Sequence, residues 1–279
     1  MFLVTGAKGQ LGLCIKDLLA EKAAYLDVDT LDITDEAAVL KLTKEPAFTG
    51  IINCAAYTNV DKAEDEPALA EKVNAQGPAN LAKLAAELDI PLVHISTDYV
   101  FDGKACSPLT ETDAVSPLGV YGRTKLAGEE NVLKYAKTAA IIRTAWLYSP
   151  YGKNFVKTML ALGGTRPQIK VVSDQVGTPT YAPHLAAAIL EILPQIKKGT
   201  KEIYHYTDAG VASWYDFAFY AIKRAGLPAE VLPIMTKDYP TKATRPAYSV
   251  LSKEKIINTF NLTLHHWSKG VESCVQKLS

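Results

Sequence analysis

Three side chains in the first half of the chain have the types and spacing needed to reduce a carbonyl group. Tyr121 and Lys125 are four residues apart, so on a helix they share one face. Thr97 follows the apolar run Leu92–Ile95, which is typical of a buried strand. A tyrosine whose pKa is lowered by a nearby cation can donate a proton to a carbonyl oxygen, and a threonine hydroxyl can donate a second hydrogen bond. We therefore predict Tyr121 as proton donor, with Lys125 and Thr97 supporting it.

Carbonyl reduction also needs a hydride donor, and a glycine-rich turn near the start of the chain predicts a dinucleotide site. Gly6, Gly9 and Gly12 follow the first apolar run with the spacing G-x-x-G-x-x-G. Gly6 permits a tight turn, Gly9 lets a pyrophosphate approach a helix N-terminus, and Gly12 lets that helix pack against the sheet. The predicted contacts in this turn are Gly6, Gly9, Gln10, Leu11 and Gly12.

Several carboxylates follow the second predicted strand, where a dinucleotide site binds the adenosine ribose. Asp27 lies 21 residues after Gly6 (27 − 6), close to the usual distance of about 20. Asp29 and Asp32 compete for this role. The segment 32–35 is equally compatible with a helix cap that has Thr34 at the N-cap position.

Cofactor choice stays open between NADPH and NADH. Asp27 favours NADH because its charge repels a 2′-phosphate, whereas Lys8 inside the glycine turn could reach that phosphate. Small residues after the third strand would let a cofactor lie close to the backbone. Further predicted cofactor contacts are Ile33, Ala55, Ala56 and Tyr57, together with Tyr121 and Lys125.

Alternating short apolar runs and amphipathic stretches predict an α/β fold with a Rossmann-like, doubly wound parallel sheet. The expected strands are Phe2–Thr5, Tyr25–Val28, Ile51–Cys54, Leu92–Ile95 and Ala139–Arg143. The expected helices are Gln10–Lys22, Glu36–Leu42, Pro67–Leu88 and Tyr121–Tyr135. Because parallel strands end at one edge, the glycine turn, Thr97 and Tyr121 should meet in one crevice.

After Trp146 the alternation fades, so we divide the chain into a dinucleotide-binding domain (1–146) and a smaller C-terminal substrate lobe (147–279). The boundary is expected to be interleaved. Helices are expected at Asn154–Leu162 and Tyr181–Ile196, a strand at Glu202–Thr207, and a helix capped by Ser213 that runs through Ala225. The segment Val171–Thr180, rich in polar residues, Gly and Pro, is expected to be a loop, and Leu227–Pro246 lacks helical periodicity.

Composition excludes several classes of partner. The 30 basic and 30 acidic residues leave no net charge, which argues against a nucleic-acid-binding or membrane-surface protein. The apolar runs are too short to cross a membrane. Four dispersed cysteines and an N-terminus without a basic leader favour a reducing, cytoplasmic location. The five histidines lack metal-ligand spacing, and we expect no metal requirement and a hydrogen-bonded core position for His94.

The motifs together resemble the extended short-chain dehydrogenase/reductase family. Besides the glycine turn and the Tyr–Lys pair, the similarity is carried by Asn53-Cys54-Ala55-Ala56, Ala55–Glu64, Ser96–Phe101, Arg143–Tyr148, Gly152–Phe155, Asp174–Thr180 and Arg245-Pro246. Within the family, these segments are most similar to the branch of enzymes that reduce dTDP-4-dehydro-L-rhamnose. The resemblance covers almost the whole chain.

This resemblance implies an oxidoreductase that reduces the 4-keto group of a dTDP-4-keto-6-deoxy sugar to give dTDP-L-rhamnose, with NADPH slightly favoured over NADH. It implies that Thr97 tunes the pKa of Tyr121. The substrate contacts that it implies are Thr58, Val60, Thr97, Asp98, Tyr99, Tyr121 and Trp146, with Asn154 and Arg245 near the diphosphate. A core position for Trp146 and a structural ion pair for Arg245 remain the alternatives.

Other activities remain open at this stage. A related dehydratase would carry a second carboxylate after Asp98, and Tyr99 stands there instead. Another nucleotide-sugar epimerase or reductase, and a non-catalytic nucleotide-binding regulatory subunit, stay as alternatives. The presence of Thr97, Tyr121 and Lys125 favours an active enzyme.

Overall fold

Six parallel strands form the central sheet of the computed structural model, which describes residues 1–44 and 48–278. Their order is β10-β5-β4-β3-β1-β2. Because β2 and β3 lie on opposite sides of β1, the chain reverses direction at the β1–β3 pair, and ligands bind at such a switch point. The strands are β1 (Phe2–Thr5), β2 (Ala23–Leu26), β3 (Gly50–Asn53), β4 (Leu92–Thr97), β5 (Ala139–Thr144) and β10 (Lys201–His205).

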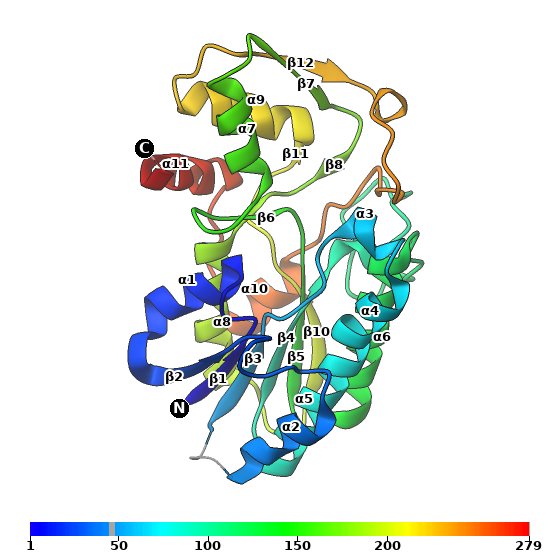
Figure 1. Cartoon of the computed structure of the whole chain (residues 1–279), viewed down its shortest axis with the longest axis vertical. Helices are drawn as coiled ribbons and strands as arrows, with labels where there is room; N and C mark the ends of the chain where they lie inside the picture. Colours follow the sequence, from blue (N-terminus) through cyan, green and yellow to red (C-terminus); the bar gives the residue numbers. More distant parts are fainter. Residues whose placement is uncertain (45–47, 279) are drawn as a thin grey trace.

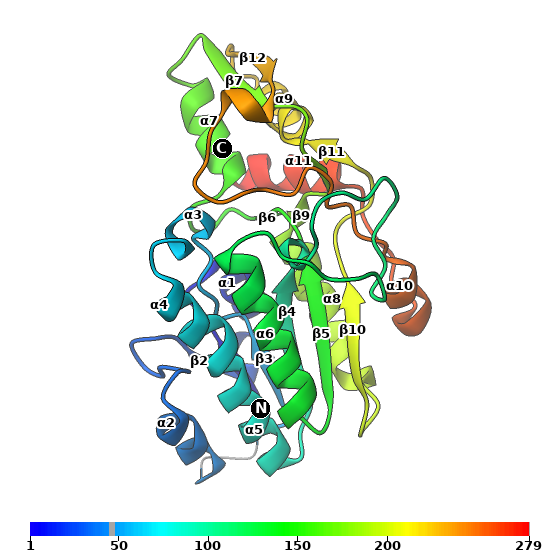
Figure 2. The same cartoon turned by 90° about the vertical axis from the view of Figure 1, so that its right-hand side faces the viewer.

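Helices cover both faces of the sheet, as Figures 1 and 2 show. Successive strand residues point to opposite faces, so Val4 packs in one apolar core and Leu3 in the other. The first face is covered by α1 (Gln10–Leu19), α8 (Ala182–Ile192) and α10 (Glu254–Phe260). The second is covered by α2 (Glu36–Lys41), α5 (Gly77–Leu88) and α6 (Val120–Tyr135). The predicted doubly wound α/β class is confirmed.

A second group of elements lies beyond the carboxyl edge of the sheet (Figure 2). Its helices are α7 (Phe155–Gly163), α9 (Trp214–Arg224) and α11 (Trp267–Leu278). Three two-stranded ladders accompany them: β6 (Leu147–Tyr148) with β9 (Thr180–Tyr181), β7 (Gln168–Val172) with β12 (Glu230–Ile234), and β8 (Val176–Gly177) with β11 (Ala212–Ser213). Ser213 caps α9 through a capping box with Asp216, as the sequence predicts.

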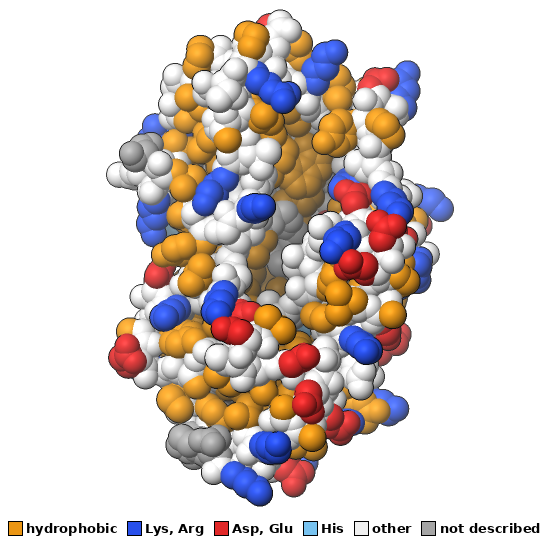
Figure 3. All heavy atoms as spheres, viewed as in Figure 1, with side chains coloured by type: hydrophobic (Ala, Val, Ile, Leu, Met, Phe, Trp, Pro, Cys, Tyr) orange, Lys and Arg blue, Asp and Glu red, His pale blue; other side chains and the backbone are white. Residues whose placement is uncertain are grey.

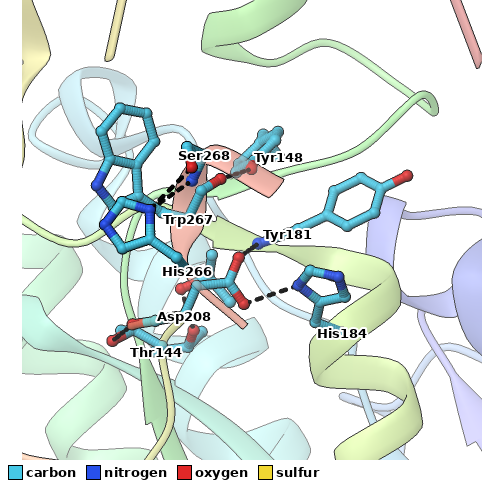
Figure 4. A network of polar contacts seen from close by, with 10 residues as sticks. Thr144, Tyr148, Tyr181, His184, Asp208, His266, Trp267 and Ser268 are labelled. Atoms are coloured by element: carbon cyan, nitrogen blue, oxygen red, sulfur yellow. Dashed lines mark hydrogen bonds and ion pairs between the residues drawn. The ribbon is translucent and has the colours of Figure 1, made fainter. Parts of the chain in front are cut away.

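The chain crosses between the two groups several times, because residues 182–205 return to the sheet as α8 and β10. A buried polar network lies at these crossings (Figure 4). The Asp208 carboxylate accepts a hydrogen bond from the Tyr181 backbone N–H (3.2 Å) and lies 2.9 Å from His184 Nδ1. Tyr148 donates to the Trp267 carbonyl at 3.1 Å. The two groups of elements are thus extensively interleaved along the chain. The division at residue 146 into a dinucleotide-binding domain and a substrate lobe stays a prediction about function.

Three local predictions need correction. Val171–Thr180 is not only a loop, since it includes the end of β7, all of β8 and the start of β9, whose partners are distant in sequence. The N-cap of α2 is Asp35, not Thr34, because the Asp35 side chain accepts from the Ala38 N–H at 3.0 Å.

The third correction concerns the predicted helix Pro67–Leu88. It comprises α4 (Pro67–Glu71), a π-helical turn at Lys72–Gln76, and α5. Pro78 lacks an N–H, and in a regular helix its ring would clash with the Asn74 carbonyl four residues earlier. The wider turn avoids this clash. Asn74 thereby lies buried and bonds Tyr57 and Thr124.

None of the helices within residues 1–44 and 48–278 is long and apolar enough to cross a membrane.

Candidate active site

A cleft of about 810 Å³ lies between the carboxyl edge of the sheet and the second group of elements. Figure 3 shows this hollow, with hydrophobic side chains along part of its wall. Most predicted site residues line it: Gly6, Gly9, Gln10, Leu11, Asp27, Asp32, Ile33, Ala55, Ala56, Thr58, Val60, Thr97, Asp98, Tyr99, Tyr121, Lys125, Trp146 and Asn154. Gly12, Tyr57 and Arg245 are not among its lining residues.

The glycine turn joins β1 to α1 at the floor of the cleft. Gly6 has φ +65°, and a Cβ there would lie 2.5 Å from the Ala55 backbone nitrogen. A Cβ on Gly12 would lie 2.4 Å from the Gly6 carbonyl oxygen. Gly9 is the N-cap of α1 and has no side chain to occupy the helix N-terminus. The turn therefore leaves its backbone accessible to an anion, while Gly12 serves packing.

Charged groups beside the turn are paired with one another. The Asp27 carboxylate accepts hydrogen bonds from the backbone N–H groups of Lys8 (2.7 Å) and Val28 (2.9 Å). The Lys8 ammonium forms an exposed ion pair with Asp29 at 2.5 Å. The hydrogen bond with Asp29 raises the pKa of Lys8. The cation and the carboxylate that would discriminate a 2′-phosphate thus lie next to each other.

The three predicted catalytic side chains converge at the end of β4. Thr97 is the last residue of β4, while Tyr121 and Lys125 lie one turn apart on α6. The Lys125 ammonium is almost fully buried and donates to the Ile95 carbonyl at 2.6 Å. The Tyr121 ring packs edge-on against Tyr99, with centroids 5.4 Å apart. The geometry places both hydroxyls and the amine on one wall of the cleft.

Burial controls the protonation of these groups. It raises the pKa of Tyr121 to about 12, although a hydrogen bond with Thr97 acts in the opposite direction. It lowers the pKa of Lys125 to about 8, which the charge of Glu129 partly offsets. It raises the pKa of Asp98 to about 6. We expected Lys125 to lower the pKa of Tyr121; in this arrangement Thr97 does so, and Lys125 is bonded to the Ile95 carbonyl.

The segment 55–64 fixes the start of α6. Glu64 accepts the Val120 backbone N–H at 2.7 Å, beside the N-cap Gly119. Asp61 pairs with both terminal nitrogens of Arg245, at 2.8 and 3.1 Å. Tyr57 donates to Glu66 at 2.7 Å. Tyr57 and Arg245 therefore have protein partners, and for Arg245 the structure shows the ion pair that was considered as an alternative.

Trp146 also lines the cleft and has φ +49°, a conformation that side-chain-bearing residues rarely adopt. Its ring stacks on Trp214 with centroids 3.6 Å apart and an interplanar angle of 12°. Another face of the residue lines the cleft. Trp146 is thus both packed and exposed to a ligand, so the two roles considered for it are compatible.

Asn154 has a local role that the sequence did not predict. Its side-chain oxygen caps α7 by accepting the Lys157 N–H at 3.1 Å. Its amide nitrogen donates to the Ser149 carbonyl and to Gln10, at 2.7 and 2.9 Å. These bonds fix the loop over the glycine turn, and contact with a diphosphate stays a prediction.

His94 is only half satisfied, contrary to expectation. Its register partner Asn53 donates to His94 Nδ1 at 3.0 Å, because the Asn53 oxygen already accepts from Thr5 and from the Ala55 N–H. Within the described chain no group bonds His94 Nε2. Burial holds the pKa of His94 well below its usual range, so the ring is neutral.

Sequence reasoning missed several lining residues, among them Leu31, Val73, Thr144, Gly152 and Lys153. Lys153 is exposed and supplies a cation over the glycine turn. Its place beside Asn154 in a segment used for the family resemblance was the available signal. The apolar lining residues gave no such signal, because a cleft residue between two layers has the same hydrophobic sequence pattern as a core residue.

Comparison with known proteins identifies the family. The model described as the RmlD substrate binding domain matches residues 1–279. A dTDP-4-dehydrorhamnose reductase from Aggregatibacter actinomycetemcomitans is 40% identical over 97% of this chain and 97% of its own length. The chain belongs to the RmlD family of dTDP-4-dehydrorhamnose reductases. The family resemblance inferred from the motifs is thereby confirmed.

Solved structures of RmlD-family proteins share the fold. One from Clostridium acetobutylicum has a TM-score of 0.94 and 43% identity, and the match covers 99% of both chains. One from Bacillus anthracis, described as a dTDP-4-dehydrorhamnose reductase in complex with NADP, has a TM-score of 0.93 and 37% identity, covering 99% of this chain and 98% of that one.

Residues 1–44 and 48–278 contain no group of three or more His, Cys, Asp or Glu side chains that could hold a metal ion. The expectation that catalysis needs no metal stays a prediction.

Proposed function

We propose that this chain reduces the 4-keto group of dTDP-4-dehydro-L-rhamnose to give dTDP-L-rhamnose, with NADPH or NADH as reductant. Overall, the ketone, the reduced nicotinamide and one proton give the alcohol and the oxidised nicotinamide. The observation that carries the proposal is that Thr97, Tyr121 and Lys125 line the same cleft as the glycine turn. Family membership supports the substrate class. A cytoplasmic place in dTDP-rhamnose biosynthesis is part of the proposal.

The cleft fits a dinucleotide. Its floor is a backbone cradle in which a Cβ on Gly6 would meet the Ala55 nitrogen at 2.5 Å, and Gly9 leaves the α1 N-terminus accessible for a pyrophosphate. Gln10 and Leu11 continue that cradle, while Asp27 lies where the adenosine ribose is expected. When bound, the reduced nicotinamide supplies the hydride.

Tyr121 is the proton donor in this mechanism. With a pKa of about 12 its hydroxyl is protonated at neutral pH, so the proton needed by the ketone oxygen is in place before reaction. The Thr97 hydroxyl donates to Asp98 Oδ1 at 3.1 Å in this structure; turned towards the substrate, it would donate a second hydrogen bond to the ketone oxygen and stabilise the charge that develops there. Lys125, held at the end of β4 by its bond to the Ile95 carbonyl, would bind the cofactor ribose, and its positive charge would make Tyr121 a stronger acid.

The remaining lining residues position the substrate. Thr58, Val60 and Tyr99 line the cleft with Tyr121, whose ring packs against Tyr99, and Trp146 offers a further aromatic surface. Asp98, with a pKa of about 6, is mostly ionised at neutral pH and can accept a sugar hydroxyl. Binding of the nucleotide part holds the 4-keto carbon in position.

A direct assay tests this function against its alternatives. The protein is mixed with dTDP-4-dehydro-L-rhamnose and either reduced nicotinamide, and the loss of nicotinamide absorbance and the product are followed. We expect stoichiometric formation of dTDP-L-rhamnose. A C4 epimer instead would indicate another nucleotide-sugar reductase, and cofactor binding without turnover would indicate a regulatory subunit.

We expect dual cofactor use, with NADPH favoured by less than about 100-fold, because Asp27 and Lys8 act in opposite directions in a solvated groove. Asp27→Ala should move the preference towards NADPH by up to about tenfold, since it removes a charge that repels the 2′-phosphate. Lys8→Met should move it towards NADH. The ratio of kcat/KM for the two cofactors measures both shifts, and a wild-type preference above about 100-fold would contradict this balance.

We expect kcat/KM to fall as pH rises through about 8, the pKa of Lys125. Lys125 carries its charge below that pH and loses it above, whereas Tyr121, with a pKa of about 12, stays protonated throughout. This fall, the basic limb of the pH profile, therefore reports the titration of Lys125. In Lys125→Met the limb should disappear and NADPH binding should weaken. An unchanged limb in that variant would assign the titration to another group.

A further inference from the structure

Arg143 belongs to a segment that supports the family resemblance, yet the mechanism above gives it no role. Its guanidinium is almost fully buried and binds both oxygens of Glu129, with Nε–Oε1 at 2.9 Å and Nη2–Oε2 at 2.7 Å. Ser96, its register partner on β4, donates to the same carboxylate at 2.5 Å. A buried bidentate pair that also accepts a third hydrogen bond fixes the carboxylate orientation.

Glu129 lies on the catalytic face of α6. It follows Lys125 by four residues and Tyr121 by eight, so all three share one side of the helix. Two bonds join this face to the end of β4: Lys125 to the Ile95 carbonyl, and Glu129 to the Ser96 hydroxyl. The next residue of β4 is Thr97, so the pair of bonds sets how the three catalytic side chains lie relative to one another.

We propose that Glu129, held by Arg143 and Ser96, is a positioning residue that keeps Lys125 charged and in register with the end of β4. The inference rests on the proposed function, because it concerns the lysine used there. Glu129 touches neither the cleft nor its contents and acts only through its neighbours.

The surroundings of this carboxylate make its charge necessary. Arg143 is closed off on its other sides by the Phe101 ring, 5.1 Å from the guanidinium, and by His205, 3.5 Å from Nη1. Burial lowers the pKa of His205 to about 3, so His205 adds no charge. Glu129 is thus the anion that stands between two buried cations, Arg143 and Lys125.

Other groups near Lys125 cannot replace that anion. Burial raises the pKa of the Cys54 thiol above its usual range, so it stays neutral, and His94 is neutral as well. Asp98 follows β4 and acts on Tyr121. In the described part of the chain, the titratable and charged groups on or near the catalytic face of α6 include Cys54 after β3, His94 on β4, Asp98 and Tyr99 after it, Arg143 on β5, and Tyr121 and Glu129 on α6 itself.

The test compares Glu129→Gln with Glu130→Gln, the same change on the exposed side of α6. Kinetics and NADPH affinity, measured by fluorescence, are followed from pH 6 to 9. We expect the basic limb near pH 8 to move down by about one unit in Glu129→Gln, which lowers kcat/KM about fivefold at pH 8. NADPH binding should show the same shift, and Glu130→Gln should match the wild type.

Glu129→Gln leaves Arg143 buried without a counter-charge and could fail to fold. The double variant Glu129→Gln/Arg143→Met removes both charges and should recover thermal stability while keeping the displaced limb. A folded variant, single or double, with the wild-type limb in both measurements would overturn the proposal and leave Glu129 a purely structural residue. If the wild type does not turn over the sugar nucleotide, the proposed function fails, while the limb in NADPH binding still decides the role of Glu129.

Discussion

Replacing Tyr121 by phenylalanine should lower kcat at least ~10²-fold while NADPH binding is retained, within the usual contribution of a general acid. The variant keeps the ring and its edge-on contact with Tyr99, so the wall of the cleft stays intact. It loses the hydroxyl that holds a proton at neutral pH. Thr97 would then remain as the only predicted hydroxyl donor to the ketone oxygen, and a neutral threonine is a far weaker acid. Single-turnover kinetics with the dTDP-sugar measure the loss.

Two further variants make this result specific. Thr97→Val should cost less than Tyr121→Phe, since it removes one hydrogen bond to the oxygen while the acid remains. Tyr135→Phe removes a hydroxyl at the far end of the same helix and should leave turnover unchanged. Near-normal turnover in Tyr121→Phe would mean that another group donates the proton.

The sheet, and the position of Thr97, Tyr121 and Lys125 in one cleft, were predictable from sequence because their signals are local. A strand buried on both faces is a short apolar run, and the i, i+4 spacing of Tyr121 and Lys125 defines a helix face directly. The glycine turn combines a tight turn with close backbone contact, which few other residues can satisfy. Each of these features assigns its residues to a strand, a helix face or a turn without any knowledge of the tertiary packing.

What the sequence did not reveal depends on contacts between distant segments. The two-residue strands β8 and β9 exist because β11 and β6 lie beside them. The contact of Asn154 and Arg245 with the diphosphate stays a prediction, and the sequence did not indicate their bonds to Gln10 and Asp61 in the folded chain. Residue type indicates what a side chain can bind, whereas packing decides which partner it finds.

The network around Glu129 is a second case in which contacts between distant segments decide the partner of a side chain. Arg143 lies within an apolar strand, and its resemblance to a family motif carried no information about its partner. The pairing with Glu129 follows from the β4–β5 register and from the packing of α6 on that face. A charged residue in a buried strand is itself a signal for a partner. Because an unpaired buried cation is energetically costly, Arg143 had to have a buried carboxylate partner.

The largest effect is expected from the nucleotide part of the substrate. The free 4-keto-6-deoxy sugar should be reduced with a kcat/KM at least ~10³-fold lower than its dTDP conjugate, or roughly 4 kcal/mol of transition-state binding. The chain has no net charge, so no broad basic surface attracts the diphosphate and affinity must come from a few placed groups. We expect Trp146, which lines the cleft with its ring stacked on Trp214, to be one of those groups.

Trp146→Ala separates recognition of the nucleotide from catalysis. We expect it to lower kcat/KM for the dTDP conjugate by about tenfold or more, because a stacked aromatic surface is lost, and to change the value for the free sugar by less than about threefold. Both sugars are compared under identical NADPH, so effects on the cofactor or on folding cancel in the ratio. Comparable kcat/KM for the free and conjugated sugars in the wild type would mean that the cleft does not recognise the nucleotide. The dTDP-sugar assignment would then fail even if Tyr121 proved to be the proton donor, because the first conclusion rests on recognition of the nucleotide and the second on the Tyr121 hydroxyl.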